Sequence, residues 1–129
     1  MNESTRMKTM RLGVAGLGTV GAGLLKLIER QDELRIPGRL EVTAVSARSR
    51  SRGRGVDISK LRWVDDPVEL ALADDVDVVV ELIGGTTDAF DIVAASLRAK
   101  KPVVTGNKAL LAERGVELGF EVTVAGRRE

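Results

Sequence analysis

RLGVAGLGTVG, at residues 11–21, joins a short apolar run to a helical pattern through three closely spaced glycines. Residues 11–15 are typical of a buried strand, and from Thr19 onward apolar residues recur at the spacing of an amphipathic helix. Gly16, Gly18 and Gly21 fit the pattern G-x-G-x-x-G. This pattern indicates a phosphate-binding turn when a strand precedes it and a helix follows it, as the flanking residues here predict.

Each of the three glycine positions of this motif requires glycine for a physical reason. Gly16 permits a tight turn, Gly18 lets a pyrophosphate approach the backbone because it has no Cβ, and Gly21 lets the helix pack close to the strand. The free amides and the dipole at the start of the helix favour a bound anion. We therefore predict that the chain binds a dinucleotide. The alternative is a glycine-rich strand–helix turn that binds no ligand.

The rest of the chain alternates strand and helix patterns. Continuous valine-rich strands separated by helices predict an α/β domain with a doubly wound, mainly parallel sheet of the Rossmann type and helices on both faces. We expect this domain at residues 10–126, between a disordered N-terminal tail at 1–9 and a C-terminal tail at 127–129. The expected helices are 19–34, one starting at 66, 92–99 and 108–118, and the further expected strands are 40–45, 62–64, 76–80, 101–105 and 120–125.

The composition argues against several classes of function. The chain has 129 residues, a net charge of +1 and 2% aromatic residues, whereas a nucleic-acid binder needs a basic field and stacking platforms. It has no cysteine and no histidine, which removes disulfides, cysteine nucleophiles, Ser-His triads and the commonest zinc ligands, so we expect no metal site. No apolar run approaches the roughly 18–20 residues of a membrane span. We expect a cytoplasmic protein without membrane or nucleic-acid partners.

The end of the second strand bears on which dinucleotide is bound. An NAD enzyme usually places an acid about 20 residues beyond the glycine motif, where it holds the ribose hydroxyls. Glu41 stands near that distance but begins the strand, roughly 15 Å from the carboxyl end where cofactors bind. At that end stand Arg48 and Arg50, and arginine grips a 2′-phosphate in a bidentate fork. We therefore predict NADP(H). NAD remains the alternative if this segment is only a solvated basic loop.

Two further segments carry a more specific signal. They are VELIGGT at residues 80–86 and VVTGNKALLA at residues 103–112. Together with the glycine motif they resemble the cofactor-binding domain of homoserine dehydrogenase, over roughly residues 12–118. That family reduces aspartate semialdehyde to homoserine with NADPH or NADH, on the way to threonine, methionine and isoleucine. The resemblance implies an NAD(P)-dependent oxidoreductase of amino-acid biosynthesis, with a small amino-acid substrate.

The resemblance also implies roles for individual positions. Lys108 is expected near the nicotinamide and the substrate, where an ammonium group can stabilise negative charge on a carbonyl oxygen or supply a proton. The alternative is a lysine at a helix start that is merely exposed to water. Glu81, also at the end of a strand, either orients this lysine or caps a loop. The cofactor-binding positions implied are Gly16, Leu17, Gly18, Thr19, Val20, Gly21, Gly84, Gly85, Thr86, Thr105 and Lys108.

The chain departs from the family pattern at three places. Gly106 replaces the usual alanine, and Asp88 and Ala89 stand where a proline commonly follows Gly-Gly-Thr. Beyond Leu118 the expected helix is shorter than in the family. The resemblance then implies that the catalytic and dimerisation region, which supplies an acid and a second lysine, is missing. On this interpretation the chain is incomplete for catalysis alone, through natural truncation, a frameshift or deliberate cutting.

Two other functional classes stay open on the sequence. The chain could be a stand-alone NAD(P)-binding sensor that signals to a partner, or a non-functional fragment. The expected strand at 120–125 would lie at an edge of the sheet without a neighbour. Exposed strand edges favour aggregation or pairing with another copy, so a homodimer is an expected assembly.

Overall fold

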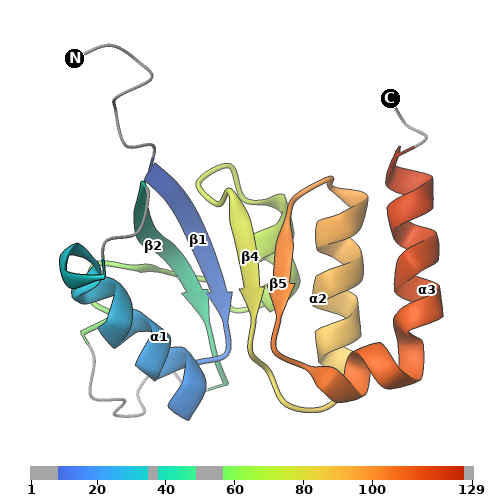
Figure 1. The fold of residues 1–129 in the computed structure, drawn as a ribbon, viewed down its shortest axis with the longest axis horizontal. Helices are drawn as coiled ribbons and strands as arrows, with labels where there is room; N and C mark the ends of the chain where they lie inside the picture. Colours follow the sequence, from blue (N-terminus) through green and yellow to red (C-terminus); the bar gives the residue numbers. More distant parts are fainter. Residues whose placement is uncertain (1–8, 35–37, 49–56, 127–129) are drawn as a thin grey trace.

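A five-stranded parallel sheet forms the centre of the molecule (Figure 1). The computed structural model describes residues 9–34, 38–48 and 57–126. The strand order is β3-β2-β1-β4-β5, in which the chain runs outward from β1 in one direction and then from β4 in the other. This is the doubly wound arrangement, so the predicted Rossmann-type sheet is confirmed. The strands are β1 (Thr9–Ala15), β2 (Arg39–Ser46), β3 (Arg62–Trp63), β4 (Val78–Glu81) and β5 (Val103–Thr105).

Helices cover both faces of the sheet, and the strands are apolar on both sides for that reason. Val80 of β4 packs in a cluster with Leu25 on one face, whereas its neighbour Val79 packs with Ile92 on the other. A third cluster, which includes Leu110, joins the two C-terminal helices. Continuous valine runs are typical of strands buried in this way. The helices are α1 (Thr19–Glu29), α2 (Thr87–Arg98) and α3 (Lys108–Gly126), with 3₁₀ helices η2 (Gln31–Glu33) and η3 (Pro67–Leu72).

The carboxyl ends of the strands lie at one edge of the sheet, which we call the carboxyl edge (Figure 1). Ala15 at the end of β1 is paired with Ser46 of β2 on one side and with Glu81 of β4 on the other. Glu81 is in turn paired with Thr105 of β5. The segments that follow β1, β4 and β5 lead directly into α1, α2 and α3, so all three helices begin at this edge.

Several predicted boundaries shift. The predicted helix 19–34 ends at Glu29, because the Gln31 side chain bonds the backbone of Ile28 and Leu40 and turns the chain back to β2. The segment starting at Asp66 is a 3₁₀ helix with the predicted N-cap: its carboxylate accepts a bond of 3.0 Å from the Val68 amide. The predicted helix 92–99 begins at residue 87, and the predicted strand 76–80 occupies residues 78–81.

The predicted strand at residues 120–125 is wrong. This segment continues α3, which runs from Lys108 to Gly126 with a break in helical geometry at Arg114. The alternation of apolar and polar residues there favours a strand, but strand propensity depends on pairing with neighbours. Extending an existing helix needs no new nucleus. The argument that an unpaired strand at 120–125 would drive pairing between copies therefore lapses, and so does the expectation of a shortened helix.

Some predictions concern residues outside the described ranges. They are the tails at 1–8 and 127–129 and the residue Arg50. Thr9, which we expected in the N-terminal tail, is instead the first residue of β1. Within the described ranges, no helix is both long and apolar enough to cross a membrane.

Candidate cofactor-binding site

The glycine turn between β1 and α1 is fixed by close backbone approaches. Gly16 has φ +101°, and its amide donates a bond of 2.8 Å to the carbonyl of Ser46. A Cβ at Gly16 would lie 2.7 Å from the Leu82 carbonyl oxygen, and one at Gly21 would lie 2.0 Å from the Gly16 carbonyl oxygen. Neither position can hold a side chain without moving backbone. The turn thus brings the start of α1 tightly against the ends of β1 and β4.

Gly18 is the opposite case. It is the N-cap of α1, it is exposed, and no atom lies within 4 Å of the position a Cβ would take. The first turn of α1 contains no acidic residue, and no side chain caps its free amides. A helix start with unsatisfied amides and open space before it is suited to an anion such as a phosphate.

A cavity of about 430 Å³ opens at the carboxyl edge, in front of this turn. Its volume is in the range typical of small-molecule sites. It brings together the glycine turn, the end of β2 and the loop that follows β4. The lining residues are Gly16, Leu17, Gly18, Ser46, Ala47, Arg48, Asp65, Pro67, Leu82, Ile83, Gly84 and Asp88.

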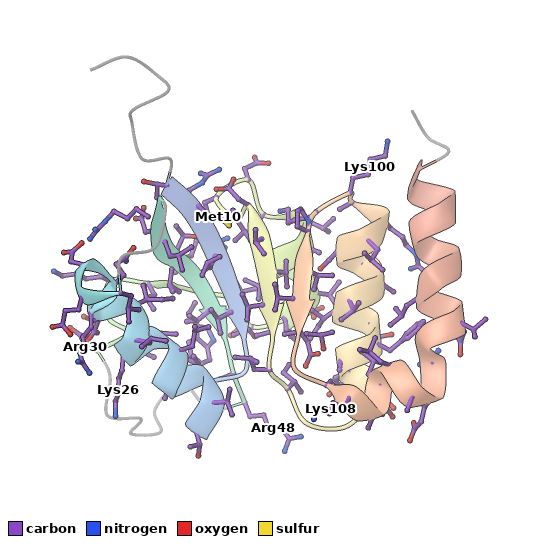
Figure 2. The ribbon with its side chains drawn as sticks, in the orientation of Figure 1. Met10, Lys26, Arg30, Arg48, Lys100 and Lys108 are labelled. Atoms are coloured by element: carbon purple, nitrogen blue, oxygen red, sulfur yellow. The ribbon has the colours of Figure 1, made fainter. Side chains whose placement is uncertain are left out.

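Five of the predicted site residues thus line one cavity, while others do not. The predicted site residues that lie at the carboxyl edge but do not line the cavity are Thr19, Val20, Gly21, Gly85, Thr86, Thr105 and Lys108. Lys108 is exposed at the first residue of α3, and Figure 2 shows it at the same end of the molecule as Arg48. Among the described residues, neither a hydrogen bond nor an ion pair involves the Lys108 side chain.

Glu41 lies far from this cavity. It is the third residue of β2, paired with Arg11 of β1, and it lines a separate cavity of about 450 Å³ together with Arg39. That cavity lies near the amino end of β2, whereas Ser46 and Arg48 lie at its carboxyl end. The position of Glu41 agrees with our reason for rejecting it as the ribose-binding acid.

Glu81 has a structural role that the sequence left open. Its side chain is fully buried, and its carboxyl oxygens accept bonds from the Ile83 amide, at 2.7 Å, and from the Thr105 hydroxyl. It therefore holds the loop after β4 to the end of β5. No bond between Glu81 and Lys108 exists in the described part of the chain, so Glu81 does not orient this lysine directly.

Asn107 is a site residue that sequence reasoning missed. Its side-chain oxygen accepts a bond of 2.9 Å from the Leu110 amide and so caps α3. Its side-chain nitrogen donates to the carbonyls of Ile83, at 3.3 Å, and Gly85. The signal for the cap was present, since an asparagine directly before a helical run is a common N-cap. The bonds to the loop after β4 had no local signal.

Comparison with known proteins assigns the chain to a family. Residues 16–127 match the family model described as homoserine dehydrogenase, NAD binding domain. The chain belongs to the homoserine dehydrogenase family. The matched region contains the glycine turn, the cavity and the segment around Lys108, so the resemblance inferred from the motifs is confirmed.

Individual homoserine dehydrogenases agree with this assignment. The enzyme of Bacillus subtilis is 36% identical over 93% of this chain, and that of Pseudomonas aeruginosa is 39% identical over the same share. The solved structure of homoserine dehydrogenase from Thiobacillus denitrificans matches with a TM-score of 0.80 at 32% identity, over 93% of this chain. The chain spans 31%, 30% and 28% of the lengths of these three relatives.

Proposed function

We propose that this chain binds the dinucleotide of a homoserine dehydrogenase in the cavity at the carboxyl edge, with preference for NADP(H). The observation that carries the proposal is the open space over Gly18, at the uncapped start of α1 and within a cavity of about 430 Å³. The whole enzyme's reaction would be the reduction of aspartate semialdehyde to homoserine.

The residues present fit the cofactor. The pyrophosphate would lie over the first amides of α1, at Gly18 and Thr19, with Leu17 and Val20 beside it. The loop formed by Gly84, Gly85 and Thr86 would flank the cofactor from the β4 side. Arg48, and with it Arg50, would grip the 2′-phosphate of NADP(H).

Lys108 is the catalytic residue of this proposal. When bound, the cofactor supplies the hydride for the substrate carbonyl carbon. The Lys108 ammonium, at the start of α3, would donate a hydrogen bond or a proton to the carbonyl oxygen as charge develops there. In the family that this chain resembles, an acid and a second lysine complete the proton transfer, and we place neither on this chain.

The proposed partners follow from the same site. They are the dinucleotide and, in the whole enzyme, a small amino-acid substrate. The homodimer that we propose for the whole enzyme rests on the family resemblance alone. A cytoplasmic location without nucleic-acid or membrane partners is the setting we propose for this biosynthetic reaction.

Calorimetric titration with NADPH and NADH tests the cofactor preference. We expect NADPH to bind more tightly, by about tenfold or more, because a hydrogen bond to a charged group contributes about 1.5–3 kcal/mol. Arg48→Ala should weaken NADPH binding and leave NADH binding unchanged. Arg39→Ala, which removes an exposed arginine at the opposite edge, is the control. Equal affinities in the unaltered chain, or tighter binding of NADH, would contradict the NADP assignment.

A further inference from the structure

A buried carboxyl group without a cationic partner lies at the centre of the carboxyl edge. Glu81 is 0% exposed, and within the described ranges no ion pair involves it. Burying such a group is unfavourable unless its oxygens are hydrogen-bonded. Both oxygens are bonded, one by the Ile83 amide at 2.7 Å and the other by the Thr105 hydroxyl. One donor thus comes from the loop after β4 and the other from the last residue of β5.

These bonds extend into what we call the Glu81 network, formed by the side chains of Glu81, Thr105 and Asn107. The Thr105 oxygen accepts a bond of 3.0 Å from the backbone amide of Asn107, so its own hydrogen remains available for Glu81. The Asn107 side chain donates to the carbonyls of Ile83 and Gly85. The network is therefore a closed ring that joins the loop after β4 to the loop between β5 and α3.

The ring lies between the 84–86 loop, which we propose flanks the cofactor, and Lys108, which is expected near the nicotinamide. On one side are Gly84, which lines the cavity, and Gly85, whose φ is +85° and whose carbonyl Asn107 holds. On the other side is Lys108, the residue directly after Asn107. Asn107 holds Gly85 directly, and Glu81 acts on the spacing of Gly85 and Lys108 through Thr105, which accepts from the Asn107 backbone amide, and through Ile83.

We propose that Glu81 is a positioning residue, which sets the separation between the 84–86 loop and the start of α3 and so shapes the nicotinamide end of the site. This inference rests on the proposed function. Glu81 is not a proton-transfer group, because it is fully buried and both oxygens are engaged. Glu81 must accept from both the Ile83 backbone amide and the Thr105 hydroxyl. Glutamine cannot do this, because its single carbonyl oxygen accepts from one of the two donors and its NH2 group then faces the other.

The test compares two ligands, NADPH and 2′-phospho-ADP-ribose, which is the same molecule without its nicotinamide. Titrations would use the unaltered chain, Glu81→Gln, Thr105→Val and Thr105→Ser, each checked by circular dichroism. We expect Glu81→Gln and Thr105→Val to weaken NADPH binding about fivefold to tenfold, the effect of losing one hydrogen bond. Binding of 2′-phospho-ADP-ribose should stay unchanged. Thr105→Ser keeps the hydroxyl that Thr105→Val removes, so it should bind NADPH as tightly as the unaltered chain does.

Three results would overturn the inference. Equal weakening of both ligands would mean that the Glu81 network supports the fold in general, and unchanged NADPH binding would mean that it positions nothing. Failure of Thr105→Ser to restore binding would show that the hydroxyl is not the relevant group. If neither ligand binds the unaltered chain, the proposed function fails first and this inference falls with it.

Discussion

Gly16 and Gly21 are glycines because backbone atoms occupy the space around them, whereas Gly18 faces open space. Substitution at Gly16 or Gly21 would push a Cβ to 2.7 Å or 2.0 Å from a carbonyl oxygen and so disturb the fold. A side chain at Gly18 meets no protein atom within 4 Å. A side chain at Gly18 would therefore exclude only a bound ligand. Gly16 and Gly21 are therefore required for folding, whereas Gly18 is required for the proposed ligand binding.

Gly18→Val should abolish dinucleotide binding while leaving the circular dichroism spectrum nearly unchanged. The valine side chain would occupy the space that a pyrophosphate needs next to the α1 amides. Gly23→Val is the matched control, because Gly23 is exposed on α1 and also has no atom within 4 Å of its Cβ position. Titration of each variant with NADPH measures the effect. Retained affinity in Gly18→Val would place the cofactor elsewhere.

The residues that the sequence predicted and those it missed differ in the range of their interactions. The glycine turn could be predicted because all its requirements lie within residues 11–21 and the flanking patterns are local. The bonds of Glu81 with Thr105, and of Asn107 with Ile83, join residues 24 positions apart. Such pairs form only once β4 and β5 lie side by side. No local pattern distinguishes a glutamate that will meet a threonine from one that will meet a lysine.

Among the elements, β1 is joined to the segment before β4 at the edge opposite the site. The Arg11 guanidinium bonds both oxygens of Asp77, at 3.1 Å and 3.0 Å, and the Arg11 amide bonds the same carboxylate at 2.8 Å. The Arg11 side chain and then its backbone amide hold the pKa of Asp77 down, at about 2. The two central strands of the sheet are thus joined at the end where no ligand is expected.

Asp77→Asn should lower the midpoint of thermal unfolding at neutral pH and reduce its dependence on pH below 4. The pKa of Asp77 is lowered in the folded state, so its contribution to stability is present above about pH 4, the unfolded pKa, and is lost as the pH falls toward 2. Thermal unfolding followed by circular dichroism between pH 7 and about 2 measures this. Asp32→Asn, which removes an exposed ion pair with Arg39, is the control. The same pH profile in the two variants would contradict the argument.

The last element shows the limit of pattern recognition at this scale. Residues 120–125 alternate as a strand does, yet they extend α3. The valine-rich segment at 78–81, in contrast, is a strand because β1 and β5 lie on either side of it. Strand formation requires such neighbours, which a local pattern does not supply. Fold class could be predicted from the order of elements, but the type of the final element could not.

At the scale of the whole molecule, the chain carries the proposed cofactor site and, in Lys108, the proposed catalytic residue. It spans about 30% of the length of its curated relatives. Lys108 is exposed at an open edge, where water weakens the electrostatic stabilisation that a charge can give. Groups that act together in catalysis lose most of their effect when one is removed. Binding and turnover should therefore be separable in this chain.

This chain alone should not oxidise homoserine at a useful rate. The measurement is NADPH formation at alkaline pH from NADP and homoserine, with Lys108→Ala as the comparison. We expect both proteins to give the rate of the protein-free control. Clear turnover that disappears in Lys108→Ala would contradict this expectation and would show that Lys108 supports turnover without further groups.

The central claim, that a dinucleotide binds at the glycine turn of the carboxyl edge, is tested most directly by amide NMR of the ¹⁵N-labelled chain titrated with NADPH. We expect the amide signals of Gly16, Gly18 and Gly84, which line the cavity there, to shift together and saturably. Those of Arg39 and Glu41, which line the cavity at the opposite edge, should stay in place. Shifts confined to Arg39 and Glu41, or no saturable shift at Gly18, would contradict the account.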